Sequence, residues 1–365
     1  MKISLLRDAF LKKINNASKF TSSRLSSSTM LQGVYMICEE NVINFYSTNL
    51  NYFYHTSLRL KENAKFKLLV EPKKISEFLS LINTEKIEVE IKEKLFIIES
   101  GKTKAEFPLY ESTEFPFPPR VTGKKQKIKT SFLRENIPFL LFSSSADDTR
   151  PVLTGINFVV EDDALKLVST DGFRLSLLNL KKEIEIPSMI VPANFLMEAM
   201  RLFDEDEVTM SHSPEEKALV FSSDEHDLYT RLIEGDYPPF ERVIPSSKKT
   251  TVELDREEFL RNVKLASIFA RDQSSVVVLK AEKDGVYLSP KTGESQGNIM
   301  YQEAKVEGEI QRIAFNFKFL LDLLSNSRSK KVIIELLRGD APALFRLEGV
   351  NNFIHIIMPV RIQEQ

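Results

Sequence analysis

The sequence predicts an α+β protein made of three similar domains, each with two helices packed on antiparallel sheets. The chain has 365 residues, of which 42% are hydrophobic and 28% are charged. This composition is too apolar for a disordered chain, and the length exceeds that of one ordinary core. In addition, one order of predicted elements, namely helix, strands, helix and strands, recurs three times along the chain.

A hairpin with a polar turn identifies each repeat. The three hairpins cover Met36–Asn49, Phe158–Asp171 and Val278–Lys291. Apolar residues flank each turn, and the Asp, Asn and Gly residues in the turns tolerate the positive φ values that hairpins require. Ser47, Ser169 and Ser289 follow the second strands and lie 122 and 120 residues apart, which sets the repeat length.

A helix is predicted ahead of each hairpin, over Arg7–Phe20, Ser131–Ser143 and Asp255–Phe269. The third has the clearest start, because Asp255 followed by Glu258 is the pattern of a capping box. In the first, Phe10, Ile14 and Ala17 form one apolar stripe. The residues expected off that stripe are Lys12, Lys13, Asn16 and Lys19.

A second helix is predicted behind each hairpin, over Pro72–Leu81, Pro192–Arg201 and Asn316–Leu324. Proline in a first turn and asparagine at a cap are both common helix starts. Strands follow, most plainly over Ile87–Lys92, where apolar and charged residues alternate, and over Val332–Leu337 and Leu344–Leu347. Each repeat therefore contains two helices and two groups of strands.

Similar segments end the first two repeats. Glu114–Pro119 aligns with Asp236–Phe240, and the lysine-rich stretches Gly123–Lys127 and Ser246–Lys249 follow as expected linkers. The predicted domains are therefore residues 1–123, 124–247 and 248–365, each of a size that suits one core.

Composition and missing motifs narrow the function. Lys and Arg number 50 against 52 Asp and Glu, for a formal charge of −2, which disfavours a protein that is basic all over. One cysteine, Cys38, and four scattered histidines predict no disulfide framework, no metal and no cofactor. We expect a cytosolic chain, because no stretch has the apolar length of a membrane span.

An enzyme is one alternative function. The sequence has no phosphate-binding loop, no dinucleotide fingerprint, no zinc-protease motif and no nucleophile elbow, so we predict no catalytic residues. Asp171 beside Arg174 fits a catalytic pair, but a turn-stabilising aspartate with a nearby cation is the commoner arrangement. A catalytic carboxylate pair stays open on sequence grounds.

Several motifs in the second repeat and at the C-terminal end appear in the order of a known family. These are Thr149–Gly155, Ser169–Leu175, Val191–Pro192, Glu234–Pro245 and Ile357–Ile362. Together with the threefold repeat, they make the chain resemble the bacterial sliding clamps, the β subunits of DNA polymerase III. The chain departs from the family at the loop Leu25–Thr29 and at the extension Gln363–Gln365.

The resemblance implies a DNA-replication protein without catalytic activity of its own. Two chains would close head to tail into a homodimeric ring that encircles double-stranded DNA without reading its sequence and confers processivity on the polymerase. The implied partners are the replicative polymerase, the clamp loader, translesion polymerases and mismatch-repair proteins. Ring closure is expected to place Lys102–Leu109 of one chain against Ile268–Val278 of the other.

Helices that line the hole of such a ring would carry cations toward DNA phosphates. The DNA-contacting candidates are Lys12, Lys13, Lys19, Arg24, Lys73, Lys74, Arg134, Arg150, Arg201, Arg261 and Lys264. The alternative is that these are ordinary solvated helix faces.

The resemblance also implies an apolar pocket that binds short linear peptides of partner proteins. Its predicted residues are Leu153, Thr170, Gly172, Phe173, Arg174, Leu175, Pro238, Arg242, Val243, Pro342, Leu344, Ile357, Met358, Pro359, Val360, Arg361 and Ile362. For Ile357 and Met358 the alternative is an ordinary core strand. A monomeric scaffold that binds peptides without encircling DNA is the second alternative function.

Overall fold

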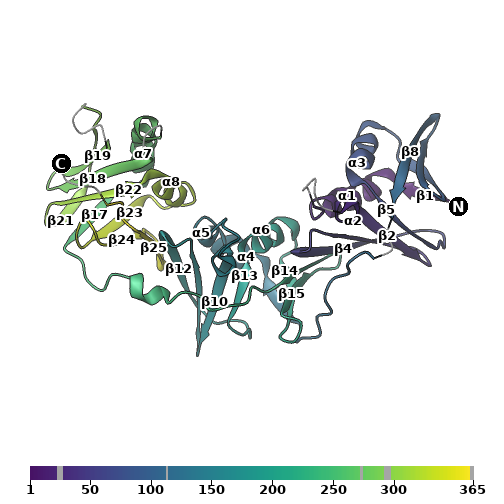
Figure 1. The fold of residues 1–365 in the computed structure, drawn as a ribbon, viewed down its shortest axis with the longest axis horizontal. Helices are drawn as coiled ribbons and strands as arrows, with labels where there is room; N and C mark the ends of the chain where they lie inside the picture. The colour runs from purple at the N-terminus through teal and green to yellow at the C-terminus, as the bar shows by residue number, and fades with distance from the viewer. Residues whose placement is uncertain (23–27, 112–113, 272–273, 292–296, 362–365) are drawn as a thin grey trace. The chain divides into compact units, whose positions relative to one another are not determined.

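The computed structural model describes residues 1–22, 28–111, 114–271, 274–291 and 297–361 (Figure 1). Arg24, Ile362 and Gln363–Gln365, together with most of the loop Leu25–Thr29, lie outside these residues. The chain divides into two compact units. The first comprises residues 1–130 and 198–232, and the second comprises residues 131–197 and 233–365.

The first repeat confirms the predicted order of elements and adds a strand before the first helix. Its elements are β1 (Lys2–Leu6), α1 (Arg7–Ser18), α2 (Thr29–Gln32), β2 (Val34–Glu39), β3 (Val42–Thr48), β4 (Tyr52–Arg59), β5 (Phe66–Val70), α3 (Pro72–Leu81), β6 (Lys86–Lys92), β7 (Leu95–Ser100) and β8 (Thr103–Tyr110). The hairpin of Met36–Asn49 is β2 and β3, which pair antiparallel.

The second repeat has the same order, with its first helix broken in two. Its elements are β9 (Gln126–Lys129), α4 (Thr130–Asn136), α5 (Pro138–Leu141), η1 (Pro151–Thr154), β10 (Gly155–Glu161), β11 (Ala164–Thr170), β12 (Arg174–Lys181), β13 (Met189–Pro192), α6 (Ala193–Leu202), β14 (Glu207–Ser213), β15 (Ala218–Ser222), β16 (His226–Arg231) and η2 (Phe240–Val243). The break precedes Pro138, whose nitrogen carries no hydrogen and so cannot donate to the helical ladder.

The third repeat carries one additional strand, β21. Its elements are β17 (Thr250–Asp255), α7 (Arg256–Ala270), β18 (Val276–Glu282), β19 (Gly285–Pro290), β20 (Met300–Glu303), β21 (Lys305–Gly308), β22 (Gln311–Asn316), α8 (Phe317–Ser325), β23 (Lys331–Leu336), β24 (Ala343–Leu347) and β25 (Val350–Ile357). Asp255 caps α7 by accepting a hydrogen bond from the Glu258 backbone N at 2.8 Å, which confirms that half of the predicted capping box.

Strand pairing repeats three times as well. In each repeat the strand before the first helix pairs with the strand after the second helix, as in β1–β6, β9–β14 and β17–β23. The two hairpin strands pair in β2–β3, β10–β11 and β18–β19. The similarity of the repeats is therefore a property of the fold as well as of the sequence.

Two further pairings join neighbouring repeats into continuous sheets. Strand β4 of the first repeat pairs with β16 of the second, and β12 of the second pairs with β25 of the third. The middle repeat is thereby divided between the two compact units, because each of its halves extends a neighbour's sheet. The domain boundaries at 123/124 and 247/248 stay predictions.

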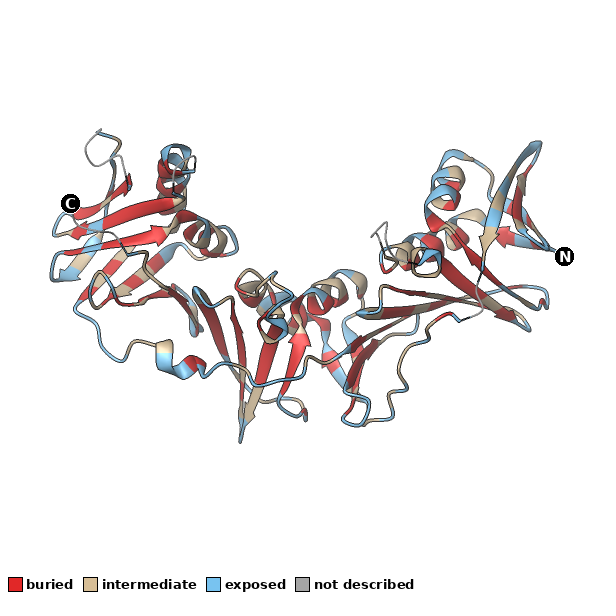
Figure 2. Cartoon of the chain, in the orientation of Figure 1, coloured by how far each residue is buried: buried red, intermediate tan, exposed pale blue. Residues whose placement is uncertain are grey.

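An apolar patch on each hairpin sheet is covered by the segment that ends its repeat. Phe115 packs with Tyr35 and Leu69 in the first repeat. In the second, Phe240 packs with a cluster of strand residues that comprises Val168, Leu175, Leu177 and Ile356. In the third, Val360 packs on Val276, Val278 and Ala314. Figure 2 shows the buried residues concentrated along the strands.

The predicted contact segment Ile268–Val278 needs a correction. Its end, Val276–Val278, belongs to β18, which is buried and lies between β19 and β22 in its sheet. Such a strand has both edges paired and cannot accept another chain. The helical start is different, because Ile268 and Phe269 of α7 are exposed by 47% and 45%. Residues 272–273 lie outside the described part of the chain.

No helix among the described residues has both the length and the apolarity needed to cross a membrane.

Candidate functional site

The centre of the predicted peptide site is a tight corner between β11 and β12, which we call the second corner (Thr170–Arg174). Thr170 Oγ1 donates to the backbone O of Arg174 at 2.6 Å and accepts from the backbone N of Gly172 at 3.0 Å. Asp171 Oδ1 accepts from the backbone N of Phe173 and of Arg174. Gly172 has a φ of +93°, which a residue without Cβ adopts readily.

The C-terminal strand brings a second set of predicted residues to this corner. Arg174 pairs with Ile357 in the β12–β25 ladder, and the backbone N of Met358 donates to the O of Phe173 at 2.8 Å. Beyond it, the N of Val360 donates to the O of Ala314 in β22 at 2.8 Å. Met358–Val360 therefore spans from the second corner to the sheet of the third repeat.

The predicted peptide-site residues differ in how far they are buried. The buried ones are Leu153, Thr170, Leu175, Leu344 and Ile357. Those of intermediate exposure are Arg174, Val243, Pro342, Met358, Pro359 and Val360, and the exposed ones are Gly172, Phe173, Pro238, Arg242 and Arg361. Phe173 is 60% exposed at the tip of the corner.

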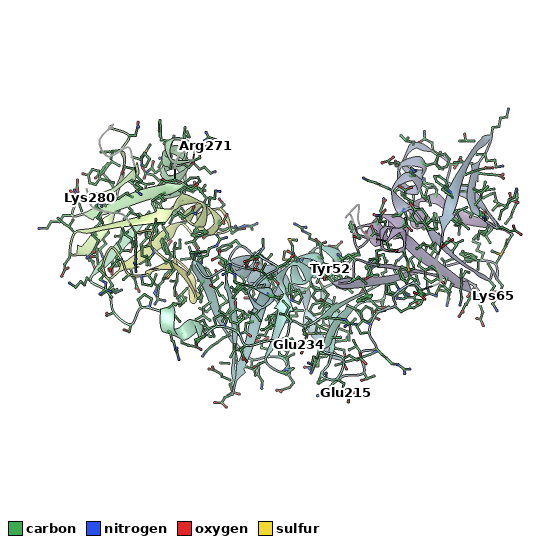
Figure 3. The ribbon with its side chains drawn as sticks, in the orientation of Figure 1. Tyr52, Lys65, Glu215, Glu234, Arg271 and Lys280 are labelled. Atoms are coloured by element: carbon green, nitrogen blue, oxygen red, sulfur yellow. The ribbon has the colours of Figure 1, made fainter. Side chains whose placement is uncertain are left out.

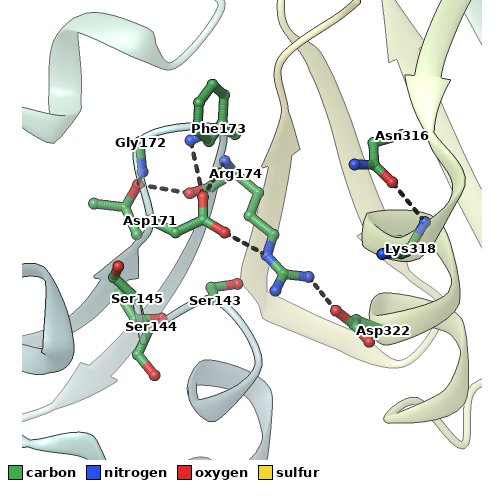
Figure 4. A network of polar contacts seen from close by, with 12 residues as sticks. Ser143, Ser144, Ser145, Asp171, Gly172, Phe173, Arg174, Asn316, Lys318 and Asp322 are labelled. Carbon is green, nitrogen blue, oxygen red and sulfur yellow. Dashed lines mark hydrogen bonds and ion pairs between the residues drawn. The ribbon is translucent and has the colours of Figure 1, made fainter. Parts of the chain in front are cut away.

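Arg174 points into the protein. Its side chain is only 10% exposed, and Nε donates to Asp171 Oδ2 at 3.0 Å (Figure 4). Nη1 donates to Asp322 of α8. The guanidinium carbon lies 4.6 Å from the ring centroid of Phe319 and 5.9 Å from that of Phe142. The turn-stabilising interpretation of Asp171 thus describes the observed contacts.

Sequence reasoning missed Phe142, Phe319 and Asp322. Asp322 lies 148 residues from Arg174 along the chain, so no local pattern pairs them. The available signal was the one-turn spacing of Phe319 and Asp322, which puts both side chains on one face of α8.

A buried polar chain lies behind the second corner. Ser143 Oγ is 2.8 Å from Ser176 Oγ, which is 3.0 Å from Nδ1 of His355. His355 is fully buried, and burial, aided by the charge of Arg174, lowers its pKa to about 3. A serine and a histidine meet here, but both are fully buried, so a substrate in solution has no access to them.

Most of the predicted DNA-contacting residues are exposed cations on helices. Those exposed in the structure are Lys12, Lys19, Lys73, Lys74, Arg134, Arg150, Arg201, Arg261 and Lys264. Several pair with a carboxylate one turn away, as Lys74 does with Glu71 at 3.0 Å and Arg201 with Glu198 at 3.2 Å. Exposed pairs of this kind are weak, so a phosphate can compete for the cation.

Lys13 does not fit the predicted DNA-contacting role. It is 8% exposed, against the expectation that it lies off the buried stripe of α1. Its Nζ donates to Thr56 Oγ1 at 3.1 Å and to Glu225 Oε2 at 3.3 Å. Glu225 Oε2 also accepts a hydrogen bond from Lys12 Nζ, and the hydrogen bonds from the two lysines lower the pKa of the Glu225 carboxyl. Lys13 therefore ties α1 to the β15–β16 turn and leaves little surface for DNA.

Two of the exposed arginines have further contacts in the second unit. Arg150 Nε donates to Asp147 Oδ2 at 3.0 Å, and its Nη1 donates to the O of Asp171 at 3.4 Å. Arg134 lines a hollow of 680 Å³ that also includes Arg328 and Glu348. Arg150 thus braces the second corner from the side of the preceding loop.

The described residues contain no group of three or more His, Cys, Asp or Glu side chains placed to hold a metal ion.

Three family models match the chain in succession. The N-terminal domain of the DNA polymerase III β subunit matches residues 1–119, its central domain matches residues 127–239, and its C-terminal domain matches residues 241–361. The chain belongs to this family of β sliding clamps.

Whole-length relatives agree with the clamp assignment. The β sliding clamp of Bacillus subtilis is 25% identical over 99% of this chain and 100% of its own length. That of Treponema pallidum is 26% identical over the full length of both. In fold, the chain is similar to the crystal structure of the Bacillus subtilis sliding clamp, with a TM-score of 0.88, 24% identity and full coverage of both chains. A Streptococcus pneumoniae β chain gives a TM-score of 0.90 at 24% identity, over 99% of this chain and 100% of that one.

Proposed function

We propose that two copies of this clamp chain close head to tail into a ring around double-stranded DNA. The ring holds the replicative polymerase on its template by enclosure, and it has no catalytic activity of its own. The cytosolic location expected from the sequence belongs to the same proposal.

The pairing order of the repeats carries this proposal. The last strand of the second repeat, β16, pairs with the fourth strand of the first, β4, and β25 of the third repeat pairs with β12 of the second. The rule is that the last strand of a repeat pairs with the fourth strand of the repeat before it. Two strands have no such partner among the described residues: β8, the last strand of the first repeat, and β20, the fourth strand of the third. Among the described residues, Thr103–Pro108 of β8 has β7 as its only neighbour, and β20 ends its sheet. Pairing β8 of one chain with β20 of another continues the rule and closes a ring.

Apolar side chains accompany both free strands, exposed ones beside β20 and half-buried ones beside β8. On the β20 side, α7 packs beside β19 and β20 and exposes Leu265, Ile268 and Phe269. On the β8 side, Phe107 contacts Phe78 of α3, with ring centroids 5.8 Å apart. Burial of such residues between chains adds the apolar contribution that a stable interface needs.

Exposed lysines and arginines on α1, α3, α4, α6 and α7 support contact with DNA phosphates. A chain of net charge −2 with cations on its helices attracts a duplex locally while its remaining surface does not. Contacts to phosphates alone carry no sequence information, which suits a ring that slides.

The second corner and the strand end Met358–Arg361 support docking of partner peptides. Exposed Phe173 and Pro238 and half-buried Met358 supply adaptable apolar surface, and Arg242 supplies a cation. The polymerase, the clamp loader and repair proteins are the proposed sources of such peptides.

Retention on DNA tests the ring directly. The protein, loaded onto nicked circular DNA by a clamp loader, is expected to stay bound through gel filtration and to be lost after the circle is cut. Equal loss from circular and linear DNA would reject enclosure. A metal-dependent nuclease or phosphatase activity of the purified protein would reject the non-catalytic role.

The interface has its own test. Replacing Ile268 and Phe269 together by Asp puts two charges beside the free edge and is expected to convert the dimer into a monomer in gel filtration. Ile310→Asp is the matched control, because Ile310 is 62% exposed in the turn before β22. A dimer that survives the double substitution would reject this edge as the interface.

A further inference from the structure

We infer that Arg174 and Asp322 act as a tether that positions the peptide groove, and that Arg174 is not itself a peptide contact. The inference rests on the proposed docking function, and it assigns to Asp322, Phe319 and Phe142 a role that sequence motifs do not indicate.

The guanidinium of Arg174 is enclosed by partners within the protein. Arg174 is 10% exposed, its Nε donates to Asp171, its Nη1 donates to Asp322, and the ring of Phe319 lies 4.6 Å from its guanidinium carbon. Two charge-assisted hydrogen bonds and one aromatic face thus occupy the guanidinium of Arg174. Binding a peptide through it would require these contacts to break.

The two carboxylates that hold the guanidinium belong to different repeats. Asp171 lies in the second corner, and Asp322 lies on α8 of the third repeat (Figure 4). The family models assign these residues to the central and the C-terminal domain, respectively. The guanidinium thus joins, within the second unit, the two domains that flank the predicted groove.

The tether is connected through the chain to the strand end Met358–Val360. We assign Met358 and Val360 to the floor of the proposed groove, and their backbone N atoms donate to the O of Phe173 and the O of Ala314, respectively. Ala314 lies in β22, which leads through the cap residue Asn316 directly into α8. Asp322 therefore fixes the helix that continues the strand holding Val360, while Arg174 immediately follows Phe173. Cutting the tether frees the two ends of the floor to move relative to each other.

Fluorescence anisotropy with a labelled synthetic peptide tests the tether. The probe covers the clamp-contacting segment of a bacterial replicative polymerase. Asp322→Asn removes the charge but keeps the size, and we expect it to weaken binding about five- to tenfold although Asp322 touches no peptide. Arg174→Gln is expected to weaken binding by a similar factor, and the double variant by no more than either alone. Asp322→Glu retains the carboxylate and is expected to restore affinity to within about twofold.

A matched control and a second readout separate positioning from general damage. Glu258→Gln neutralises a carboxylate on the neighbouring helix α7 that pairs with Arg261 at 3.5 Å, and it is expected to leave affinity unchanged. Amide hydrogen exchange of Met358 and Val360 is expected to accelerate in Asp322→Asn and to stay unchanged in Glu258→Gln.

The outcomes are distinct. If the unmodified protein binds the peptide and Asp322→Asn binds it equally well, the tether is rejected while docking stands. If Arg174→Gln loses affinity and Asp322→Asn does not, Arg174 is a direct contact and the inference is wrong. If the unmodified protein does not bind the peptide, the docking function and the tether are both rejected.

Discussion

The corner between β3 and β4, which we call the first corner (Thr48–Tyr52), has the same hydrogen bonds between side chains and backbone as the second corner. Thr48 Oγ1 donates to the O of Tyr52 at 2.6 Å and accepts from the N of Leu50 at 2.9 Å. Asn49 Oδ1 accepts from the N of Asn51 and of Tyr52. Each corner begins at a threonine and precedes a strand that pairs with the following repeat.

The side chains of the two corners differ where the second corner is proposed to bind partners. Asn49 stands where the second corner has Asp171, and Tyr52, labelled in Figure 3, stands where it has Arg174. The first corner thus lacks both the carboxylate and the guanidinium of the ion pair. The two corners share one backbone geometry, and only the second has the charged pair Asp171 and Arg174.

The third repeat has no threonine at this position. At the equivalent position, one residue after Ser289, it has Pro290, which has neither a hydroxyl nor a backbone N–H. Its fourth strand, β20, pairs with β19 alone among the described residues.

Removing the threonine hydroxyl is expected to have the largest effect, and a similar one at both corners. Thr170→Val and Thr48→Val each lose two hydrogen bonds and leave a corner N–H unpaired, which costs about 2–3 kcal/mol of unfolding free energy. Urea titration followed by circular dichroism measures the loss. If only one of the two variants lost stability, the two corners would contribute differently to the free energy of unfolding despite their matching hydrogen bonds.

The repeat, the helices and the hairpins followed from sequence because each is a local pattern. The Thr-Asp-Gly turn of the second corner was visible for the same reason. Thr48-Asn49-Leu50 carries no such signal, since leucine is not expected at positive φ. The Arg174–Asp322 contact and the β4–β16 pairing join distant residues, and no periodicity encodes them. The prediction for Lys13 was wrong because its burial depends on Thr56 of β4 and Glu225 of the β15–β16 turn, which are distant in sequence.

A buried histidine lies behind each corner, and we predict that the two histidines reduce stability by different amounts at acidic pH. Ser176 Oγ lies 3.0 Å from Nδ1 of His355, and Tyr54 Oη, at the equivalent position, lies 2.8 Å from Nδ1 of His226. Burial lowers the pKa of both histidines, to about 3 for His355, whereas nearby Glu225 opposes the shift at His226.

The direction of the pH effect follows from these lowered values. In the unfolded chain this histidine takes up a proton near pH 6.5, whereas folded His355 takes it up only near pH 3. The contribution of neutral His355 to the free energy of unfolding is therefore fully present above pH 6.5 and decreases as the pH falls below that value. We expect a loss of about 2 kcal/mol between pH 7 and pH 5 from His355 and a smaller one from His226. His355→Asn should remove more of the pH dependence of urea unfolding than His226→Asn does. An equal change would contradict the difference in burial and charge.

Exchanging the acidic and amide residues of the two corners sharpens the comparison. Asp171→Asn places an amide N–H against the Nε–H of Arg174, and we expect it to cost about 1 kcal/mol because Arg174 keeps its contact with Asp322. The reciprocal Asn49→Asp faces Tyr52 instead of a cation, so its effect on urea unfolding is expected to stay within about 0.5 kcal/mol. A larger cost for Asn49→Asp than for Asp171→Asn would mean that the ion pair is not what distinguishes the corners.

The smallest expected effect concerns the middle residue of each corner. Leu50 has a φ of 73°, where Gly172 has 93°, and a left-handed conformation costs a residue with a Cβ about 1–2 kcal/mol. Leu50→Gly removes this strain but makes the unfolded chain more flexible, which takes back about 0.5–1 kcal/mol. Because Leu50 is 51% exposed, the substitution removes little packing, and the net expectation is a gain of about 0.5 kcal/mol in urea unfolding. Gly172→Ala is the matched change in the opposite direction and should destabilise by a similar amount. A loss for Leu50→Gly would show that the leucine side chain contributes packing at the first corner that outweighs its backbone strain.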